Sequence, residues 1–501
     1  MTDQNSGQRL ATLSDSSLSS LTTTASLPGY DRSGVRVGIA HFGVGNFHRV
    51  HEAVYIDRCL HLLDHEGWGI VGIGISDSED AITKAETFNR QDGLYTVTEF
   101  APDGTSQSRI IGAMKGYLHA PSNPEAVLNQ LADPELRIVS LTITEGGYLI
   151  DLSSGRFLLE HPDIQYDLEN EFPRTVFGFI VRALARRRHN DLAPFTIVSC
   201  DNLRRNGDTV RKAVLAVADA LDSGLATWID ERGAFPNSMV DRIAPYVTPA
   251  DRVRLNSNTA VDDAVPAMSE SYLQWVIEDR FSCGRPDFAR AGVELRDDIE
   301  LYETTKGRLL NASHVLLSYP SLLLGHRLVH DALADERVRN LIDVFMTRDV
   351  IPLLRPPDGV SLNSYKDTLI ERFANPAVGD QLIRIATDGS AKIPVFHSAT
   401  IEELIERGAD IRREAFLLAC YRKYLDGVDD VGVAIEVNEP SLGEEDRREI
   451  DAPDGLGLLR ISAFASLNLT DHLIFSTNYL RFGELLNQQG AAKTIDEVVA
   501  N

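Results

Sequence analysis

A glycine turn between two apolar runs near the start of the chain limits the possible folds more than any other feature. The run VRVGIAHF ends directly at Gly43-Val44-Gly45, and a helix-like segment, NFHRVHEAVYIDRCLHLL, follows it. A second apolar run, WGIVGIGIS, begins at Trp68 and leads to Asp77. This order of strand, glycine turn, helix and strand predicts the opening βαβ unit of a nucleotide-binding parallel sheet.

The residues of this turn have the properties that a dinucleotide site requires. Gly43 permits the tight turn, and Gly45 lets the backbone approach a pyrophosphate at the helix N-terminus, where Asn46 and Phe47 follow. The third glycine of the usual fingerprint is replaced by His48, so the short motif is also typical of an ordinary strand-to-helix turn. Its position between a strand and a helix favours a cofactor site formed by Gly43, Gly45, Asn46 and Phe47.

An acidic residue after the second strand predicts which dinucleotide binds. Asp77 can accept hydrogen bonds from the adenosine ribose and repel a 2′-phosphate, which favours NAD over NADP. Its spacing from the glycines is longer than the usual ~20 residues. An aspartate that merely starts a loop is therefore the alternative, and Asp80 is a nearby substitute for the same role.

The rest of the chain predicts a two-part architecture. The runs RIVSLTIT and FTIVSCDN read as further buried strands, with a helical stretch between them, and YTVTEF with RIIGAMKGYLH suggests a hairpin. Beyond about residue 294, long helical patterns replace the strands. The predicted class is α/β plus all-α, with the active site in the cleft between the two parts. The predicted segments are a flexible N-terminal arm (1–33), a Rossmann-type NAD-binding domain with a mostly parallel sheet (34–294), and a helical substrate and catalytic domain (295–501).

Composition narrows the classes of partner and cellular location. The formal net charge of −25 argues against binding to nucleic acid or to anionic membranes. The N-terminal 30 residues lack the basic start and apolar core of a secretory signal, and no apolar run approaches the ~20 residues that span a membrane. The four cysteines are scattered, which predicts neither disulfides nor a zinc site and fits a cytoplasmic protein.

Three histidines near the glycine turn raise the question of a metal. His41, His48 and His51 lie close together in sequence, but we identify no cysteine or carboxylate partner at ligand spacing. The sequence therefore predicts no metal.

A polar stripe on an apolar helix is the strongest candidate for catalysis. The segment ETTKGRLLNASHVLLSY contains no proline and reads as a buried helix. At about 100° per residue, Glu303, His314 and Asn311 lie about 60°, 80° and 140° from Lys306 on one face. Buried polar groups are costly unless paired, and a desolvated lysine can act as a general base. A solvated stripe on an amphipathic helix is the alternative.

Several motifs in fixed order identify a family. HFGVGNFHRVHEA, TITEGGY, SCDNLRRNG, FPNSMVDRIAP and KGRLLNASH occur one after another. With them the chain resembles the polyol-specific long-chain dehydrogenases, the mannitol dehydrogenase family, from about residue 35 to past residue 480. The resemblance implies metal-free, NAD(P)-dependent oxidation of a secondary alcohol of a polyol, with D-mannitol and D-fructose as the expected pair. An arabinitol dehydrogenase or a fructuronate-type hexuronate reductase is the alternative within the family.

The resemblance also implies roles for residues in both halves. Lys306 is similar to the family's general base, Asn202 and Asn311 to the amide pair that holds the reacting oxygen, and Glu303 to the carboxylate on the proton path. His314 corresponds to a positioning residue, while Asp241, Arg384 and Lys392 correspond to substrate-binding residues. A monomer is favoured over a dimer. The alternatives are a turn amide at Asn202, a core histidine at His314 and a first-turn helix acid at Glu303. For Asp241 the alternative is an ion-pair partner or a cap, and for Arg384 and Lys392 it is an ordinary surface or interdomain charge. A silent dinucleotide sensor is the alternative function.

Overall fold

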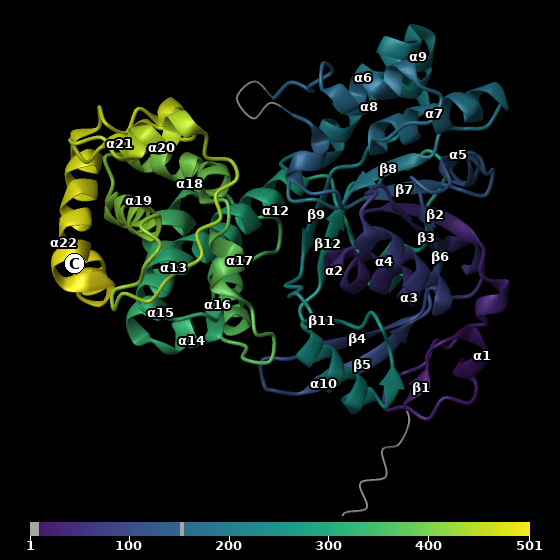
Figure 1. The fold of residues 1–501 in the computed structure, drawn as a ribbon, viewed down its shortest axis with the longest axis horizontal. Coiled ribbons are helices and arrows are strands. Elements are labelled where there is room, and N and C mark those ends of the chain that lie inside the picture. Colours follow the sequence, from purple (N-terminus) through teal and green to yellow (C-terminus); the bar gives the residue numbers. More distant parts are fainter. Residues whose placement is uncertain (1–9, 151–154, 501) are drawn as a thin grey trace, which may run out of the picture. The chain divides into compact units, whose positions relative to one another are not determined.

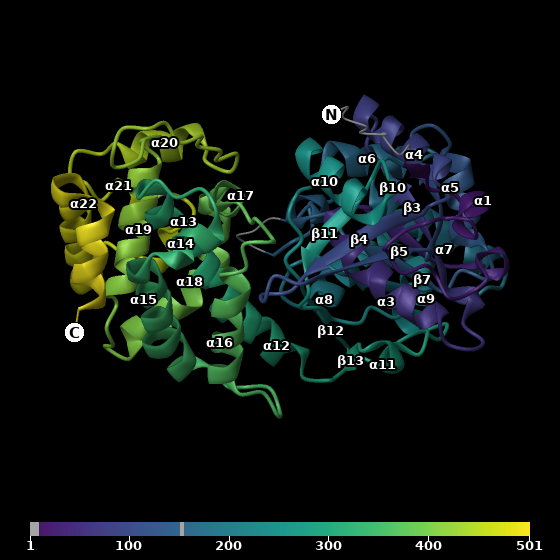
Figure 2. The same ribbon diagram turned by 90° about the horizontal axis from the view of Figure 1, so that it is seen from below.

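The computed structural model describes residues 10–150 and 155–500, and this part of the chain divides into two compact units. The first unit runs to Glu300, apart from residues 102–104, which group with the second. The second unit begins at Leu301 and is helical throughout its described elements (Figures 1 and 2). The predicted class, a Rossmann-type sheet domain followed by a helical domain, is confirmed.

A five-stranded parallel sheet forms the centre of the first unit (Figure 1). In this sheet the first strand along the chain, β2, lies between the second, β3, and the fourth, β7, so the direction of winding changes between β2 and β7. Ligands of open α/β sheets bind outside the carboxyl ends of the strands at such a switch point. In spatial order the strands are β6 (Met114–His119), β3 (Gly69–Gly74), β2 (Val37–Phe42), β7 (Ile138–Leu141) and β8 (Thr196–Ser199).

Helices cover both faces of this sheet because its strands are apolar on both sides. Within β2, Ala40 and Phe42 pack into one core and Ile39 into the other. The first core is completed by α5 (Pro124–Ala132), α7 (Val176–His189) and α8 (Asn206–Leu221). The second is completed by α3 (Glu52–Leu60) and α4 (Glu79–Arg90). Burial on both faces is typical of parallel sheets. The short α2 (Asn46–Val50) precedes α3, and α6 (Pro162–Glu169), α9 (Ser223–Arg232), α10 (Pro249–Thr259) and α11 (Phe288–Ala291) complete the unit.

The run predicted as one arm of a hairpin serves two sheets. β5 (Ser106–Ile111) pairs with β4 (Tyr95–Phe100) as expected, but the chain turns at Gly112 and continues as β6 in the central sheet. A Cβ at Gly112 would lie 2.8 Å from the Tyr30 hydroxyl, so this corner needs glycine. β11 (Ala267–Glu270) joins β4, and β9 (Ser238–Asp241), β12 (Gln274–Ile277) and β13 (Glu294–Leu295) form a third small sheet.

Residues 10–33 belong to the folded first unit rather than to a flexible arm. β1 (Ala11–Thr12) pairs with β10 (Val261–Asp262), and Leu13 is completely buried. The buried Arg32 guanidinium donates to the carbonyls of Gly112 at 2.9 Å and Met114 at 2.7 Å. Serine and threonine dominate this segment, so its few anchoring residues were not visible in the sequence pattern. Residues 1–9 of the predicted arm lie outside the described residues.

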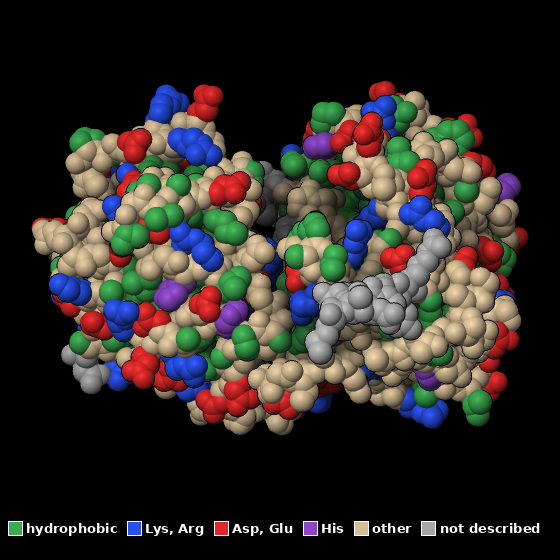
Figure 3. Space-filling model, turned by 60° about the horizontal axis from the view of Figure 1, so that its bottom comes forward, with side chains coloured by type: hydrophobic (Ala, Val, Ile, Leu, Met, Phe, Trp, Pro, Cys, Tyr) green, Lys and Arg blue, Asp and Glu red, His purple; other side chains and the backbone are tan. Residues whose placement is uncertain are grey.

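The second unit is built around α13 (Ala312–Leu323), whose residues are all buried. Burial on every side is expected of a helix surrounded by others. Acidic and basic side chains are interspersed on the face shown in Figure 3. Among the described residues, no helix is long and apolar enough to cross a membrane.

Besides α13, the helices of the second unit are α12 (Ile299–Thr305), α14 (Val329–Ala334), α15 (Glu336–Val344), α16 (Leu362–Phe373), α17 (Leu382–Ala386), α18 (Gly389–Glu406), α19 (Arg412–Tyr424), α20 (Glu444–Ile450), α21 (Gly457–Arg460) and α22 (Leu473–Val499).

Candidate active site

The glycine turn lies at the switch point of the central sheet, directly after β2. Gly43 has φ +93°, and a Cβ there would lie 2.0 Å from the carbonyl oxygen of Thr142, the residue that follows β7. Gly45 precedes α2, and a Cβ on it would meet nothing closer than 3.7 Å. The fold therefore requires glycine at 43, whereas at 45 the absent side chain leaves open space. That space fits a group such as a pyrophosphate that approaches the backbone closely.

The two residues after the turn can contact a cofactor through their backbone. The Asn46 side chain is used internally, because its amide donates to the Pro245 carbonyl at 3.2 Å and its oxygen accepts from Arg49 at 2.5 Å. Phe47 stacks on His51 with ring centroids 4.8 Å apart. The first N–H groups of a helix have no partner within the helix, so the main chain at Asn46 and Phe47 remains the group suited to bind phosphate oxygens.

The predicted specificity residue lies on the surface after the neighbouring strand. Asp77 is exposed in the loop between β3 and α4, and Asp80 is exposed in the first turn of α4. Ser78 caps this helix by accepting from the Ala81 N–H at 3.3 Å. Since β3 lies beside β2, Asp77 follows the strand next to the glycine turn, where the ribose of a dinucleotide is normally bound.

The sequence reading missed a lysine beside the glycine turn. Lys84 of α4 donates a hydrogen bond to the Val44 carbonyl, within the turn itself. Burial and the nearby Arg49 guanidinium lower the pKa of Lys84 to about 8. A lysine on an amphipathic helix carries no distinguishing signal in one sequence.

The loop after β8 places Asn202 at the carboxyl edge of the same sheet. Asn202 is exposed, and its neighbour Asp201 accepts from the Ile143 N–H at 2.9 Å and the Tyr148 hydroxyl at 2.7 Å. Asn206 is buried and donates to the Ser199 carbonyl at 3.1 Å. Asp201 and Asn206 therefore fix the loop that carries Asn202, and sequence analysis identified neither.

Asp241 ends β9 and is almost completely buried, with 2 % of its surface exposed. The adjacent Arg242 is also buried and pairs with Glu99. Arg242 therefore has its own carboxylate partner in Glu99. A buried carboxylate at the end of a strand fits a substrate-binding role, which stays a prediction.

The lysine helix contains a π-helical turn at its functional residues. The turn η4 (Lys306–Asn311) joins α12 to α13, and its closing bond runs from the Ala312 N–H to the Gly307 carbonyl, five residues back. The predicted regular α-helical spacing is wrong here. Because π-type bonding connects residues five apart, Lys306 and Asn311 lie about one turn apart and on more nearly the same side than 3.6-residue spacing allows. Such turns are frequent at functional sites.

The other members of the stripe flank this turn. Lys306 and His314 are each 8 % exposed, and Glu303 and Asn311 are half-buried. The His314 ring stacks on Phe373 of α16, with centroids 4.0 Å apart. The stripe is therefore largely withdrawn from solvent, which disfavours the solvated-face alternative.

Two side chains tie the π-helical turn to α18. Arg308 donates to the Thr400 hydroxyl at 2.9 Å and to Glu403 at 2.7 Å. His397, fully buried, lies 3.1 Å from the Ala312 carbonyl through Nε2 and 2.9 Å from Glu414 through Nδ1. These bonds fix the backbone on both sides of Asn311.

Arg384 and Lys392 lie together within the second unit. The Arg384 guanidinium forms a forked ion pair with Asp380, with contacts of 2.7 and 2.8 Å. The Lys392 amine lies 3.2 Å from the Arg384 carbonyl and 3.1 Å from that of Ile385. These contacts link the two predicted substrate residues to one short segment around α17.

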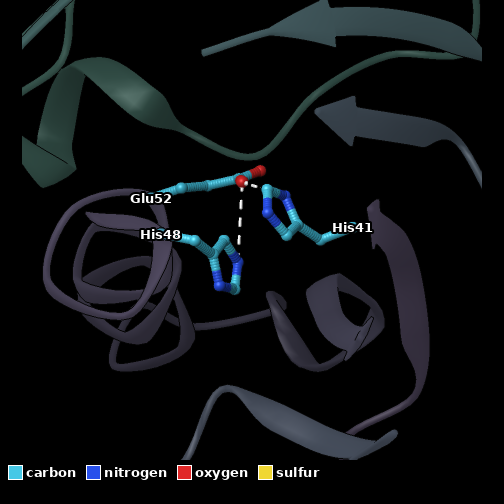
Figure 4. A group of neighbouring side chains, drawn as sticks. All are labelled: His41, His48 and Glu52. Carbon is cyan, nitrogen blue, oxygen red and sulfur yellow. Dashed lines mark ion pairs between the residues drawn. The ribbon is translucent and has the colours of Figure 1, made fainter. Parts of the chain in front are cut away.

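The histidines near the glycine turn do have a carboxylate partner, which corrects the sequence reading. Glu52 Oε2 lies 3.0 Å from His41 Nδ1 and 3.6 Å from His48 Nε2, and Figure 4 shows both rings beside this carboxylate. One ligand atom from each of the three buried residues lies within 4.8 Å of the others. The two rings are stacked at 3.6 Å and 17°, so their in-plane lone pairs run side by side instead of converging as tetrahedral zinc requires. The arrangement favours a hydrogen-bonded network.

Burial and neighbouring charges hold the His48 ring neutral beside this network. Burial, with His41 and Arg49 nearby, lowers the pKa of His48 well below its ordinary value. Among the residues that the structure describes, neither ring nitrogen of His48 has a hydrogen-bond partner.

Both halves of the chain match one family. Residues 37–290 match the mannitol dehydrogenase Rossmann domain, and residues 298–477 match the mannitol dehydrogenase C-terminal domain. The chain belongs to the mannitol dehydrogenase family. The family resemblance predicted from the motifs is confirmed, and so is an oxidoreductase activity.

Members of the mannitol dehydrogenase family with different names are similar to this chain over nearly its whole length. A polyol:NADP oxidoreductase of Gluconobacter oxydans is 44% identical and covers 95% of this chain and 98% of its own. A D-sorbitol dehydrogenase structure is 42% identical with a TM-score of 0.87, covering 97% and 100%. A Pseudomonas fluorescens mannitol 2-dehydrogenase complex with NAD and D-mannitol is 38% identical with a TM-score of 0.90, covering 97% and 99%.

Proposed function

We propose that this protein oxidises a secondary alcohol of a polyol to a ketose with NAD, with D-mannitol and D-fructose as its main pair. The observation that carries the proposal is the buried π-helical turn that presents Lys306 and Asn311, in a family of polyol dehydrogenases. A protein that only sensed a dinucleotide would need neither of these residues. The similar P. fluorescens enzyme is a complex with NAD and D-mannitol, which supports both the cofactor and the substrate.

The glycine turn and the residues around it would hold the cofactor. Gly45 leaves space for the pyrophosphate, the main chain at Asn46 and Phe47 supplies N–H donors, and Asp77 accepts from the ribose hydroxyls. When bound, NAD supplies the hydride acceptor of the reaction.

The second unit supplies the proton chemistry in this proposal. Lys306, as a neutral amine, takes the hydroxyl proton as the carbinol carbon is oxidised, and Glu303 passes this proton on toward solvent. Asn311 donates its amide hydrogens to the developing alkoxide, together with Asn202 of the first unit. Preorganised donors of this kind are worth roughly 3–4 kcal/mol each. In the reverse direction, the Lys306 ammonium protonates the oxygen of the ketose.

The contacts of Arg384 favour a neutral polyol over a hexuronate. A uronate needs a cation for its carboxylate, and Arg384 and Lys392 are the two candidates. The Arg384 guanidinium already forms a forked pair with the Asp380 carboxylate, and strong pairs of this kind leave less of the cation for a second carboxylate. Arg384 is therefore better suited to shape the pocket for hydroxyl groups, with Lys392 beside it and Asp241 as an acceptor.

A substrate panel tests the proposal. Initial rates are measured with D-mannitol, D-sorbitol and D-arabinitol, each with NAD⁺ and NADP⁺, and with fructuronate and NADH. We expect the highest kcat/KM for D-mannitol with NAD⁺ and fructose as the product. D-sorbitol is included because a D-sorbitol dehydrogenase is 42% identical to this chain. NAD binding without turnover of any polyol would instead support the dinucleotide sensor.

A further inference from the structure

The hydroxyl of Thr142 joins the glycine turn to a buried polar network, and we propose that Thr142 is a positioning residue for cofactor binding. The inference rests on the proposed NAD-dependent function. It concerns a residue that contacts the first glycine of the turn and that neither the glycine motif nor the lysine helix includes. Its role is to fix the orientation of one peptide group.

Thr142 lies where the end of the central sheet meets the glycine turn. Phe42 and Leu141 are paired as the last residues of β2 and β7, so Gly43 and Thr142 are the first residues beyond the two strands at the switch point. The Thr142 N–H donates to the Phe42 carbonyl at 2.9 Å, and its hydroxyl donates to the Gly43 carbonyl at 2.6 Å. The close backbone approach described for Gly43 brings these groups together.

A buried network of three polar residues contacts the Thr142 hydroxyl on the side away from Gly43. His41 Nε2 lies 2.9 Å from Thr142 Oγ1, and His41 Nδ1 lies 2.8 Å from Ser140 Oγ and 3.0 Å from Glu52 Oε2. Ser140 Oγ donates to the same Glu52 oxygen at 2.9 Å. His41, Ser140 and Glu52 are at most 2 % exposed, so water does not compete for these bonds.

The number of hydrogens on Thr142 determines which group donates in each of its hydrogen bonds. Thr142 has one hydroxyl hydrogen, and it is donated to Gly43, so His41 Nε2 must donate to Thr142 Oγ1. Ser140 Oγ donates to Glu52 Oε2, and His41 Nδ1 faces both of these oxygens. The direction of the hydrogen bonds from His41 through Thr142 to Gly43 is therefore defined.

Fixing the Gly43 carbonyl also fixes the N–H of the same peptide. In a trans peptide the C=O and N–H groups point in opposite directions. A Gly43 carbonyl held toward Thr142 therefore directs the Val44 N–H away from β7. Lys84 holds the next carbonyl, that of Val44, in the same manner. Without the Thr142 hydroxyl, a glycine at φ +93° is free to rotate this peptide, because glycine has few steric barriers.

The experiment compares Thr142→Val with Thr142→Ser in the full-length protein. NAD⁺ affinity is measured directly by fluorescence titration without substrate, and kcat and KM are then measured with D-mannitol. Valine has a similar shape without the hydroxyl, so we expect the Kd and KM for NAD⁺ to rise about threefold to tenfold, as for one lost hydrogen bond. We expect kcat at saturating NAD⁺ to stay within about twofold of the wild type. Thr142→Ser keeps the hydroxyl and should restore the affinity.

Thr98→Val is the matched control. Its hydroxyl bonds Ser108 at 2.9 Å in the β4–β5 sheet, so its loss should leave NAD⁺ affinity unchanged. Ser140→Ala removes the hydroxyl that bridges His41 and Glu52 and should weaken NAD⁺ binding about twofold to threefold. This variant keeps the inference testable if Thr142→Val fails to fold. Unchanged NAD⁺ affinity in Thr142→Val, or no recovery with serine, overturns the inference. Absence of NAD⁺ binding by the wild type would instead overturn the proposed function.

Discussion

Two segments are each connected to a buried histidine–glutamate pair: the glycine turn of the first unit and the lysine helix of the second. The two pairs differ in the group that the histidine contacts next to its segment. His41 pairs with Glu52 and reaches the turn through the Thr142 hydroxyl. His397 pairs with Glu414 and reaches the Ala312 carbonyl directly. A hydroxyl can donate or accept, whereas a carbonyl can only accept. The first contact can therefore rearrange, and the second cannot.

This difference matches what each segment has to do in the proposed reaction. The turn binds through its backbone, and a small rotation of one peptide changes affinity for the cofactor. The π-helical turn acts through the side chains of Lys306 and Asn311, whose positions depend on an unmoving backbone. We therefore expect changes near the turn to affect the KM for NAD⁺, and changes near the lysine helix to affect kcat.

Lys306→Ala should show the largest effect and is the strongest test of this division. General acid–base catalysis contributes about 10²–10⁴-fold, so kcat should fall by that factor at neutral pH while NAD⁺ binding persists. Steady-state rates and a separate NAD⁺ titration distinguish the two. Lys366→Ala, which removes a lysine paired with Asp343 in the same unit, is the control and should keep wild-type rates. Near-normal kcat in Lys306→Ala would refute the general-base role.

Glu414→Gln and Glu52→Gln compare the two pairs directly. With glutamine at 414, the carboxylate that faces His397 Nδ1 becomes a neutral amide, while the contact of the ring with the Ala312 carbonyl cannot rearrange, because a carbonyl only accepts. Losing a hydrogen bond to a charged group costs about 1.5–3 kcal/mol of unfolding free energy. With glutamine at 52, Thr142 can turn its hydroxyl toward His41, so only about one hydrogen bond is lost, worth about 1 kcal/mol. Denaturant unfolding measures both losses, and equal losses would contradict the comparison.

Features set by local sequence could be predicted, whereas features set by contacts between distant segments could not. The β2, β3, β7 and β8 strands and the glycine turn follow from local patterns of apolar residues and glycine, and the structure confirms the sheet domain that they imply. The π-helical turn could not be predicted, because the sequence KGRLLN fits a regular α-helix equally well and only its hydrogen bonds in the fold are of the π type. The sequence shows Glu52 four residues after His48. Its partner His41 is on a strand, however, and only the fold brings that strand against α3.

Asp77→Ala should have a moderate effect, confined to the choice of cofactor. Removing a carboxylate that repels a 2′-phosphate should lower the preference for NAD⁺ over NADP⁺ about tenfold, which corresponds to about 1.4 kcal/mol. The ratio of kcat/KM for the two cofactors measures this. The 44% identical polyol:NADP oxidoreductase makes the measurement especially informative. Asp80→Ala is the matched variant, and a larger shift there would move the role to Asp80.

The smallest effect concerns Lys84 and is seen in the pH dependence of NAD⁺ binding. The pKa of Lys84 is lowered from 10.5 to about 8 in the folded protein, so its charge beside the turn is lost as the pH rises through 8. A partly buried cation of this kind contributes up to about 1 kcal/mol to binding an anion. The KM for NAD⁺ should therefore rise about twofold to fivefold between pH 7 and pH 9.5. In the same interval the unfolded chain holds more protons at this lysine, so stability from this group rises with pH. Lys84→Gln, which keeps a donor but no charge, should remove the rise in KM, and a variant that still shows it would assign the effect to another group.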